Sequence, residues 1–87
     1  MKNQLVLLND DSEGYESLYL NGLQIAEGNP IQEGEDRIKF MARLGKEKGF
    51  TLDEFSECET IVADEKTQTE WQDNGSAPYK LEDVNSL

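Results

Sequence analysis

Apolar residues occur in several different patterns along this chain, and each pattern predicts a different element. The first is a short run that is apolar on both faces of an extended chain, which is typical of a strand covered on two sides. It consists of Gln4-Leu5-Val6-Leu7-Leu8. An acidic, turn-rich loop follows at residues 9–14, so we expect one strand over residues 4–8 that ends at this loop.

A β-hairpin is the clearest local prediction. Asn21-Gly22 supplies the two positive φ angles that a type I′ turn requires, and alternating apolar residues flank it. The predicted cross-strand pairs are Leu20 with Leu23, Leu18 with Ile25, and Tyr19 with Gln24. The leucine and isoleucine side chains then share one face, whereas Tyr19 and Gln24 share the other. The hairpin is therefore expected to have one dry and one solvated face.

Helical periodicity begins after the hairpin. Residues 34–48 place apolar side chains on one stripe and basic side chains on the opposite side. The apolar stripe consists of Ile38, Met41, Ala42 and Gly45, with Phe40 and Leu44 beside it. Gly49 is a typical residue for the left-handed position that ends a helix. We therefore expect one main helix over residues 34–48.

Two capping boxes predict two shorter helices. The first box, Thr51-Leu52-Asp53-Glu54, predicts a single turn of helix over residues 52–56. The second box, Thr67-Gln68-Thr69-Glu70, opens a short helix that Asn74-Gly75 ends. This second helix carries Trp71, for which two interpretations exist: a buried ring that holds the helix on the sheet, or an exposed anchor for a partner. We favour burial.

These elements predict an α+β fold. Residues 58–63 are rich in β-branched side chains and form a further strand. We expect a small two-layer domain in which an antiparallel β-hairpin and one or two further strands pack on one main helix, with a short C-terminal helix. The domain is expected to span residues 1–75, and residues 76–87 to be a coil tail. The candidate docking residues in this tail are Tyr79, Leu81 and Val84.

Charge is distributed unevenly along the chain, which has a net charge of −11. Residues 1–36 and 49–87 are strongly acidic, whereas residues 37–48 are basic. The basic residues of this segment are Arg37, Lys39, Arg43, Lys46 and Lys48. A basic helix between two acidic segments can fold against them, so we interpret the helix charges as internal compensation. Direct nucleic-acid binding is disfavoured, because the net charge would repel a polyanion.

The sequence lacks the residues that several common catalytic and metal sites require. The chain contains no histidine, which removes the usual general base and every Ser-His or Cys-His nucleophile pair. Cys58 is the only cysteine, so the sequence predicts no disulfide framework and no zinc site, and it fits a reducing cytoplasm. Its neighbours Glu57 and Glu59 disfavour a thiolate. We therefore predict that the protein is not an enzyme and holds no cofactor or metal.

Membrane insertion and secretion are not expected either. The longest apolar run, Leu5 to Leu8, is far shorter than a membrane span requires. No basic segment followed by a long apolar stretch is present, so the sequence predicts no signal peptide.

Three segments of the chain resemble one group of known proteins. They are Glu16-Ser17-Leu18-Tyr19-Leu20-Asn21-Gly22 with Ala26-Glu27-Gly28, then Thr69-Glu70-Trp71-Gln72-Asp73-Asn74-Gly75, and Pro78-Tyr79-Lys80-Leu81-Glu82-Asp83-Val84. Their order is similar to that in small acidic proteins of unknown function encoded by tailed phages of Gram-positive bacteria. The resemblance implies a phage origin and a location in the host cytoplasm, without a mechanism.

The excess of carboxylates leads to the functional prediction. A small fold that presents rows of carboxylates can occupy the basic groove of a nucleic-acid-processing enzyme, so we predict a host-protein-binding protein, such as an inhibitor or nucleic-acid mimic. The candidate partner-binding residues are Asp10, Asp11, Glu13 and Glu16 near the first loop, and Glu57, Glu59, Asp64 and Glu65 along the last strand. The alternative is an accessory or structural phage protein, with acidity serving solubility. One example is a small homodimer that pairs through a helix or through an exposed β edge such as strand 58–63.

Overall fold

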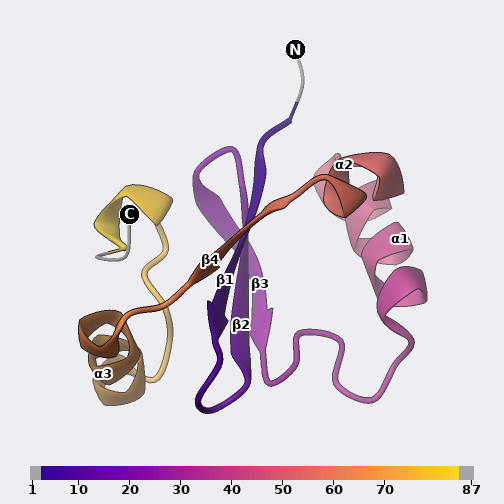
Figure 1. The fold of residues 1–87 in the computed structure, drawn as a ribbon. Coiled ribbons are helices and arrows are strands. Elements are labelled where there is room, and N and C mark those ends of the chain that lie inside the picture. The colour runs from indigo at the N-terminus through magenta and orange to yellow at the C-terminus, as the bar shows by residue number, and fades with distance from the viewer. Residues whose placement is uncertain (1–2, 85–87) are drawn as a thin grey trace.

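A four-stranded mixed sheet forms the centre of the computed structural model, which describes residues 3–84 (Figure 1). The strands are β1 (Leu5–Asp10), β2 (Tyr15–Leu20), β3 (Leu23–Gly28) and β4 (Glu59–Val62), in the spatial order β3-β2-β1-β4. β1 and β3 are both antiparallel to β2, whereas β4 runs parallel to β1. This sheet and its helices confirm the predicted α+β class.

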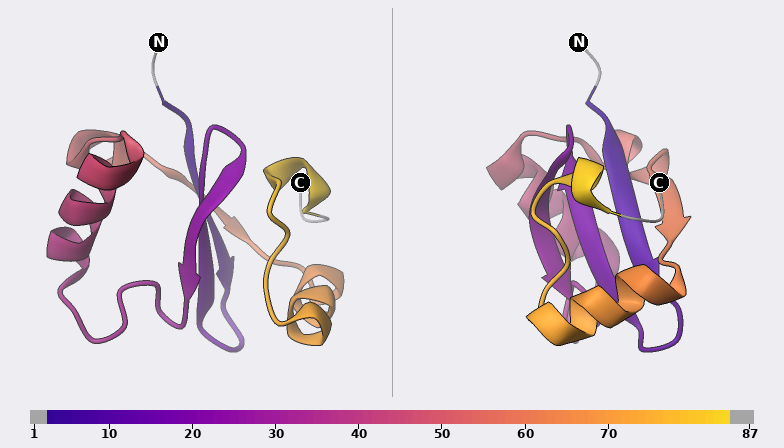
Figure 2. Two further views of the ribbon diagram at one scale, coloured as in Figure 1. Left: turned by 180° about the vertical axis from the view of Figure 1, so that it is seen from behind. Right: turned by 90° about the vertical axis from the view of Figure 1, so that its left-hand side faces the viewer.

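Helical segments cover both faces of the sheet, so the domain has three layers instead of the predicted two (Figure 2). α1 (Arg37–Lys48) and α2 (Leu52–Ser56) lie over one face. α3 (Glu65–Asn74) and the 3₁₀ helix η1 (Leu81–Asp83) lie over the other. The side chains of β1 alternate between the two faces and are apolar on both, so both faces must be covered.

Each face of the sheet therefore has its own hydrophobic core. The α1-side core contains the buried residues Leu5, Leu7, Leu18, Ile31, Met41, Leu44 and Phe50. The α3-side core contains the buried residues Val6, Leu8, Tyr19, Ala63, Trp71, Ala77 and Val84. Trp71 is only 4% exposed, which confirms that its ring packs between α3 and the sheet.

The hairpin has the predicted turn but a different register beyond it. Asn21 and Gly22 have φ angles of 51° and 88°, as a type I′ turn requires. The pairs Leu20 with Leu23 and Tyr19 with Gln24 are confirmed. The predicted pairing of Leu18 with Ile25 is wrong, because a bulge shifts the register and places Leu18 opposite Ala26.

Tyr19 lies on a buried face of the hairpin and not on the solvated face that was predicted. Its side chain is fully buried, and its hydroxyl donates a hydrogen bond of 2.6 Å to the carbonyl oxygen of Pro78. Burial raises the pKa of the Tyr19 hydroxyl. The C-terminal segment covers this face, and no local pattern in the hairpin sequence can show a cover that arrives from so far along the chain.

α1 begins three residues later than predicted. Gly34 has a φ of 78°, which does not belong to a helix, and Asp36 caps α1 by accepting a hydrogen bond of 3.0 Å from the Lys39 amide. The helix ends as predicted at Gly49, whose φ is 98°. Ile38, which the periodicity placed on the apolar stripe, is 58% exposed because it lies in the first turn, beyond the edge of the core.

The two short helices lie close to their predicted positions, but the N-cap residue of one of them differs from the prediction. Thr51 and Glu54 form the predicted capping box of α2. The cap of α3, however, is Asp64, whose side chain accepts a 2.8 Å hydrogen bond from the Thr67 amide. Thr67, the predicted cap, is instead a buried residue in the first turn, and α3 ends at Gly75 as predicted.

The segment predicted to be a coil tail packs on the rest of the fold. The Gln24 amide donates to the carbonyl oxygen of Tyr79, and the Leu81 amide donates to that of Gly22, so the segment extends the β3 edge near the hairpin turn. Val84 is buried in the α3-side core, whereas Tyr79 is 61% exposed. Residues 85–87 of the predicted tail lie outside the described residues.

Candidate partner-binding surface

The parallel pairing of β1 with β4 brings two acidic segments to the same end of the sheet. The Ala63 amide, just after β4, donates a 2.8 Å hydrogen bond to the carbonyl oxygen of Asn9 in β1. The Ser12 hydroxyl, in the loop after β1, lies 3.4 Å from Oε1 of Gln68 in α3. We call the exposed acids of these two segments the loop-end carboxylates: Asp11, Glu13, Asp64 and Glu65. The sequence had placed them in two separate groups.

Asp10 does not belong to this surface, although the sequence predicted it there. It is 1% exposed, and its Oδ1 accepts hydrogen bonds from the Ser12 amide, the Ser12 hydroxyl and the Glu13 amide, at 3.1, 2.8 and 3.3 Å. Its role is to hold the loop between β1 and β2 in shape. A partner cannot reach this carboxylate in the folded protein.

Glu16 is committed to an internal ion pair instead of a partner. Its two carboxylate oxygens lie 2.9 and 3.1 Å from the guanidinium nitrogens of Arg37 in α1, and only 14% of its side chain is exposed. Arg43 forms a second pair, with Glu35. Hydrogen bonding to Arg43 lowers the pKa of Glu35. These two pairs support the interpretation of the basic helix as internal compensation.

A second group of acids lies at the opposite end of β4, and we call Glu54, Glu57 and Glu59 the α2-end carboxylates. Together with Asn3, Gln4 and Leu5 they line a shallow hollow of about 270 Å³. Glu57 is the C-cap of α2, so only Glu59 of the predicted pair lies in the strand. The sequence did not single out Glu54 for this surface, because its capping-box position fully explained it.

Glu54 connects the first strand to α2. Its Oε2 accepts a 3.1 Å hydrogen bond from the Asn3 amide, and its Oε1 accepts bonds from the Asn3 side chain and the Thr51 amide, at 3.2 and 2.9 Å. The Thr51 amide, followed by the Asn3 side chain, lowers the pKa of Glu54. The charged form of Glu54 is therefore the form that stabilises this junction.

This contact predicts a pH-dependent difference between two variants. A carboxylate whose pKa is lowered on folding stabilises the fold above its unfolded value, and this contribution disappears as the pH falls through the lower folded value. Glu54→Gln should therefore be less stable than Glu82→Gln at pH 7, and the gap should close as the pH falls below the ordinary glutamate value of 4.5. Urea unfolding from pH 7 to 3 measures the gap. A gap that stays constant across this range would contradict the assignment.

β4 lies between the two acidic groups and forms one edge of the sheet. Figure 1 looks onto this edge and shows β4, in orange, crossing in front of the other strands from α2 to α3. Thr60 and Val62 are both exposed, and Val62 is 54% exposed. β4 is therefore an edge strand with exposed residues and with carboxylates at both of its ends.

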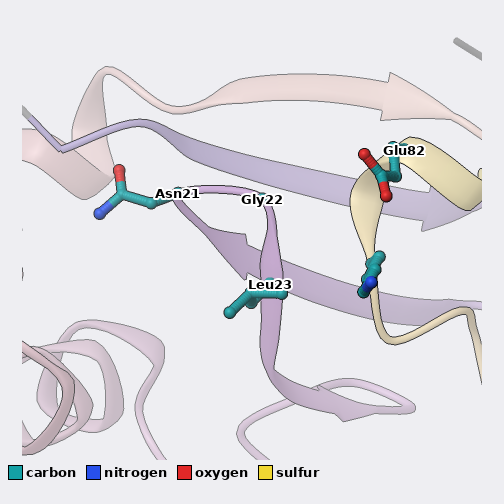
Figure 3. Close-up of a pocket in the computed structure, with 5 residues that line it drawn as sticks. Asn21, Gly22, Leu23 and Glu82 are labelled. Carbon is teal, nitrogen blue, oxygen red and sulfur yellow. The ribbon is translucent and has the colours of Figure 1, made fainter.

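Two other hollows have structural explanations. One, of about 180 Å³, is lined by Tyr15, Trp71, Gln72 and Gly75, and it lies beside the Tyr15 and Trp71 rings, whose centroids are 6.0 Å apart. The other lies where the C-terminal segment meets the hairpin turn (Figure 3). There Asn21 points away from Glu82, because its side chain accepts a 2.8 Å hydrogen bond from the Gln4 amide. Neither hollow gathers a set of reactive groups.

The cysteine and the carboxylates are the groups of this chain that metal binding or catalysis would use. Burial raises the pKa of the Cys58 thiol, which favours the unreactive neutral form. The sequence predicted that Glu57 and Glu59 disfavour the thiolate, whereas burial of the thiol raises its pKa and the nearby Arg37 acts in the opposite direction. Over residues 3–84, no group of three or more carboxylates and thiols is placed to hold a metal ion. No helix in this range is long and apolar enough to cross a membrane.

Comparison of the chain with protein-family models, with curated proteins and with solved structures finds no match. The fold and the two acidic groups beside β4 are therefore the basis for any functional conclusion. The resemblance to acidic phage proteins remains a prediction from the sequence.

Proposed function

We propose that this chain is a non-enzymatic phage protein that binds a host protein through its acidic surface in the host cytoplasm. The target is a protein with a basic nucleic-acid groove, and the bound chain acts as an inhibitor or nucleic-acid mimic. The observation that supports this proposal is the clustering of exposed carboxylates at both ends of β4. Lysine and arginine side chains that line such a groove complement a surface of this sign.

The distribution of ion pairs supports the same proposal. The arginines of α1 pair with Glu16 and Glu35, which belong to neither acidic group beside β4. Among the described residues, Asp11, Glu13, Glu59 and Glu65 form no ion pair with a lysine or arginine. The fold thus compensates its charge around α1 and leaves these carboxylates available to a basic partner.

Neutralising these four carboxylates tests the proposal. We expect a variant with Asp11→Asn, Glu13→Gln, Glu59→Gln and Glu65→Gln to lose capture of its host target from a lysate of a Gram-positive host. Each lost charge pair is worth roughly 0.2–1 kcal/mol when exposed, so four together cost about 0.8–4 kcal/mol and weaken binding by about fourfold to several hundredfold. Capture by the unmodified chain should weaken as salt rises and be displaced by duplex DNA.

A matched control separates this surface from net charge alone. Glu33→Gln, Asp73→Asn, Glu82→Gln and Asp83→Asn remove the same number of charges from exposed positions outside the two acidic groups. We expect this control to capture the target as the unmodified chain does. Equal capture by both variants would show that the carboxylates beside β4 do not form the binding surface.

A small homodimer with a structural role is the second candidate function. The open edge of β4 favours it, since exposed strand edges pair readily with one another. Sedimentation at several protein concentrations distinguishes the two candidates: a tight dimer that buries Val62 supports the structural role, and a monomer supports the host-binding role.

A further inference from the structure

The backbone of β4 has unused hydrogen-bonding groups along its outer side. The Ala63 amide points inward, to Asn9 of β1. Because successive backbone groups of a strand point in opposite directions, the amide and carbonyl groups of Ile61 also point inward, and those of Thr60 and Val62 point outward. β4 is the last strand of the sheet on this side, so these outward groups have no neighbouring strand in the described structure.

The opposite edge of the sheet, formed by β3, is partly covered by the chain itself. There the C-terminal segment pairs with β3 near the turn, through the Gln24 amide and the Leu81 amide. The chain therefore covers part of the β3 edge with its own backbone and leaves the β4 edge open. Folded proteins usually cover, shorten or charge such an edge, because it pairs with other chains.

We propose that β4 binds an extended, basic segment of a partner protein, which adds to the sheet as a fifth strand. Main-chain hydrogen bonds to Thr60 and Val62 would hold the segment, and the exposed Val62 side chain would pack against it. Glu59 lies at one end of this edge and Glu65 just beyond the other, so lysine or arginine residues at both ends of the segment find carboxylates. This inference rests on the proposed function and specifies how the partner is held.

A second copy of this chain fits the same edge poorly. In an antiparallel pair that uses both outward residues, Thr60 lies opposite Val62 of the other copy. This register brings Glu59 of each copy to the end of the pair where Asp64 and Glu65 of the other copy lie. Carboxylates gathered at both ends of a strand pair repel each other and destabilise it, whereas basic residues at these ends of a partner strand stabilise it.

The test uses a synthetic peptide and the full chain. The acetylated and amidated nonapeptide Lys-Lys-Thr-Val-Thr-Val-Thr-Lys-Lys is titrated into the protein at low salt, and amide hydrogen exchange is followed by NMR. We expect exchange at Thr60 and Val62 to slow on binding, while that of Ile61, already bonded to β1, changes little. The same peptide with glutamate in place of lysine should not bind.

Two variants test the two parts of the interaction. Thr60→Pro removes an amide that β1 does not use, so the variant should fold and bind the peptide roughly tenfold more weakly. Glu59→Gln with Glu65→Gln should also weaken binding, whereas the matched pair Glu33→Gln with Glu82→Gln should not. The charge variants and the exchange measurement do not depend on whether the proline variant folds.

Three results would overturn the inference. Peptide binding that leaves exchange at Thr60 and Val62 unchanged would place the site elsewhere. Protection of these amides without peptide, growing with protein concentration, would identify a second copy as the occupant. No peptide binding, together with undiminished capture of the host target by Thr60→Pro, would reject strand addition while leaving the proposed acidic surface intact, because that proposal is tested by the four-carboxylate variant.

Discussion

Replacing Trp71 with alanine should lower the free energy of unfolding by about 3–5 kcal/mol. The ring is 4% exposed and packs in the α3-side core, where the Tyr15 ring lies 6.0 Å away. Its removal leaves a cavity between α3 and the sheet that the short helix cannot fill by itself. A domain of this size has only about 5–15 kcal/mol of stability in total, so much of the population should unfold on mild heating.

Urea unfolding followed by circular dichroism measures this loss, since the variant has no tryptophan fluorescence. Trp71→Phe is the control, because it retains an aromatic ring and should lose less stability. Gln72→Ala, at the neighbouring exposed position, should have little effect. A Trp71→Ala variant that melts at the same temperature as the unmodified chain would refute the anchoring role and point to Trp71 as a partner contact.

Gly45→Ala should also destabilise the protein, by about 1–3 kcal/mol. Helix propensity alone predicts the opposite sign, because alanine is favoured over glycine inside a helix by about 1 kcal/mol. In this structure, however, a Cβ at Gly45 would overlap the carbonyl oxygen of Phe50, where the chain folds back against α1. Phe50 is held there by a 3.0 Å hydrogen bond from its amide to the Gly45 carbonyl oxygen.

The reverse substitution at a neighbouring position provides the control. Ala42 lies on the exposed side of α1, so Ala42→Gly should cost about 1 kcal/mol by propensity alone. Gly45→Ala and Ala42→Gly are opposite substitutions, yet both should lower the midpoint of urea unfolding. A Gly45→Ala variant that is more stable than the unmodified chain would show that the Phe50 backbone moves away at little cost.

The sequence predicted that the protein has an acidic surface, but it could not show which acidic residues belong to that surface. Asp11 and Glu65 are exposed, as the sequence predicted for residues of a partner-binding surface. Asp10 and Glu16 have the same chemistry and similar positions, yet one is buried under its own loop and the other is bound to Arg37. Burial and pairing depend on which segment arrives from elsewhere in the chain, so residue type alone cannot distinguish these four acids.

The sequence by itself determined the local elements of this protein. The type I′ turn at Asn21-Gly22, the capping box at Thr51 and the glycine at the end of α1 all act within a few residues, so their signals are complete in a short stretch. Their order also determined the α+β class.

Only the tertiary structure decided how these elements are combined. The parallel pairing of β4 with β1 and the third layer formed by α3 join residues that are distant in the chain. The strand of residues 58–63 could have joined either edge of the sheet formed by β1, β2 and β3, and α3 could have packed on either face. The observed arrangement is the one that covers both apolar faces of β1. The free energy gained by burying these faces depends on all the segments that cover them, so no single segment of the sequence can indicate it.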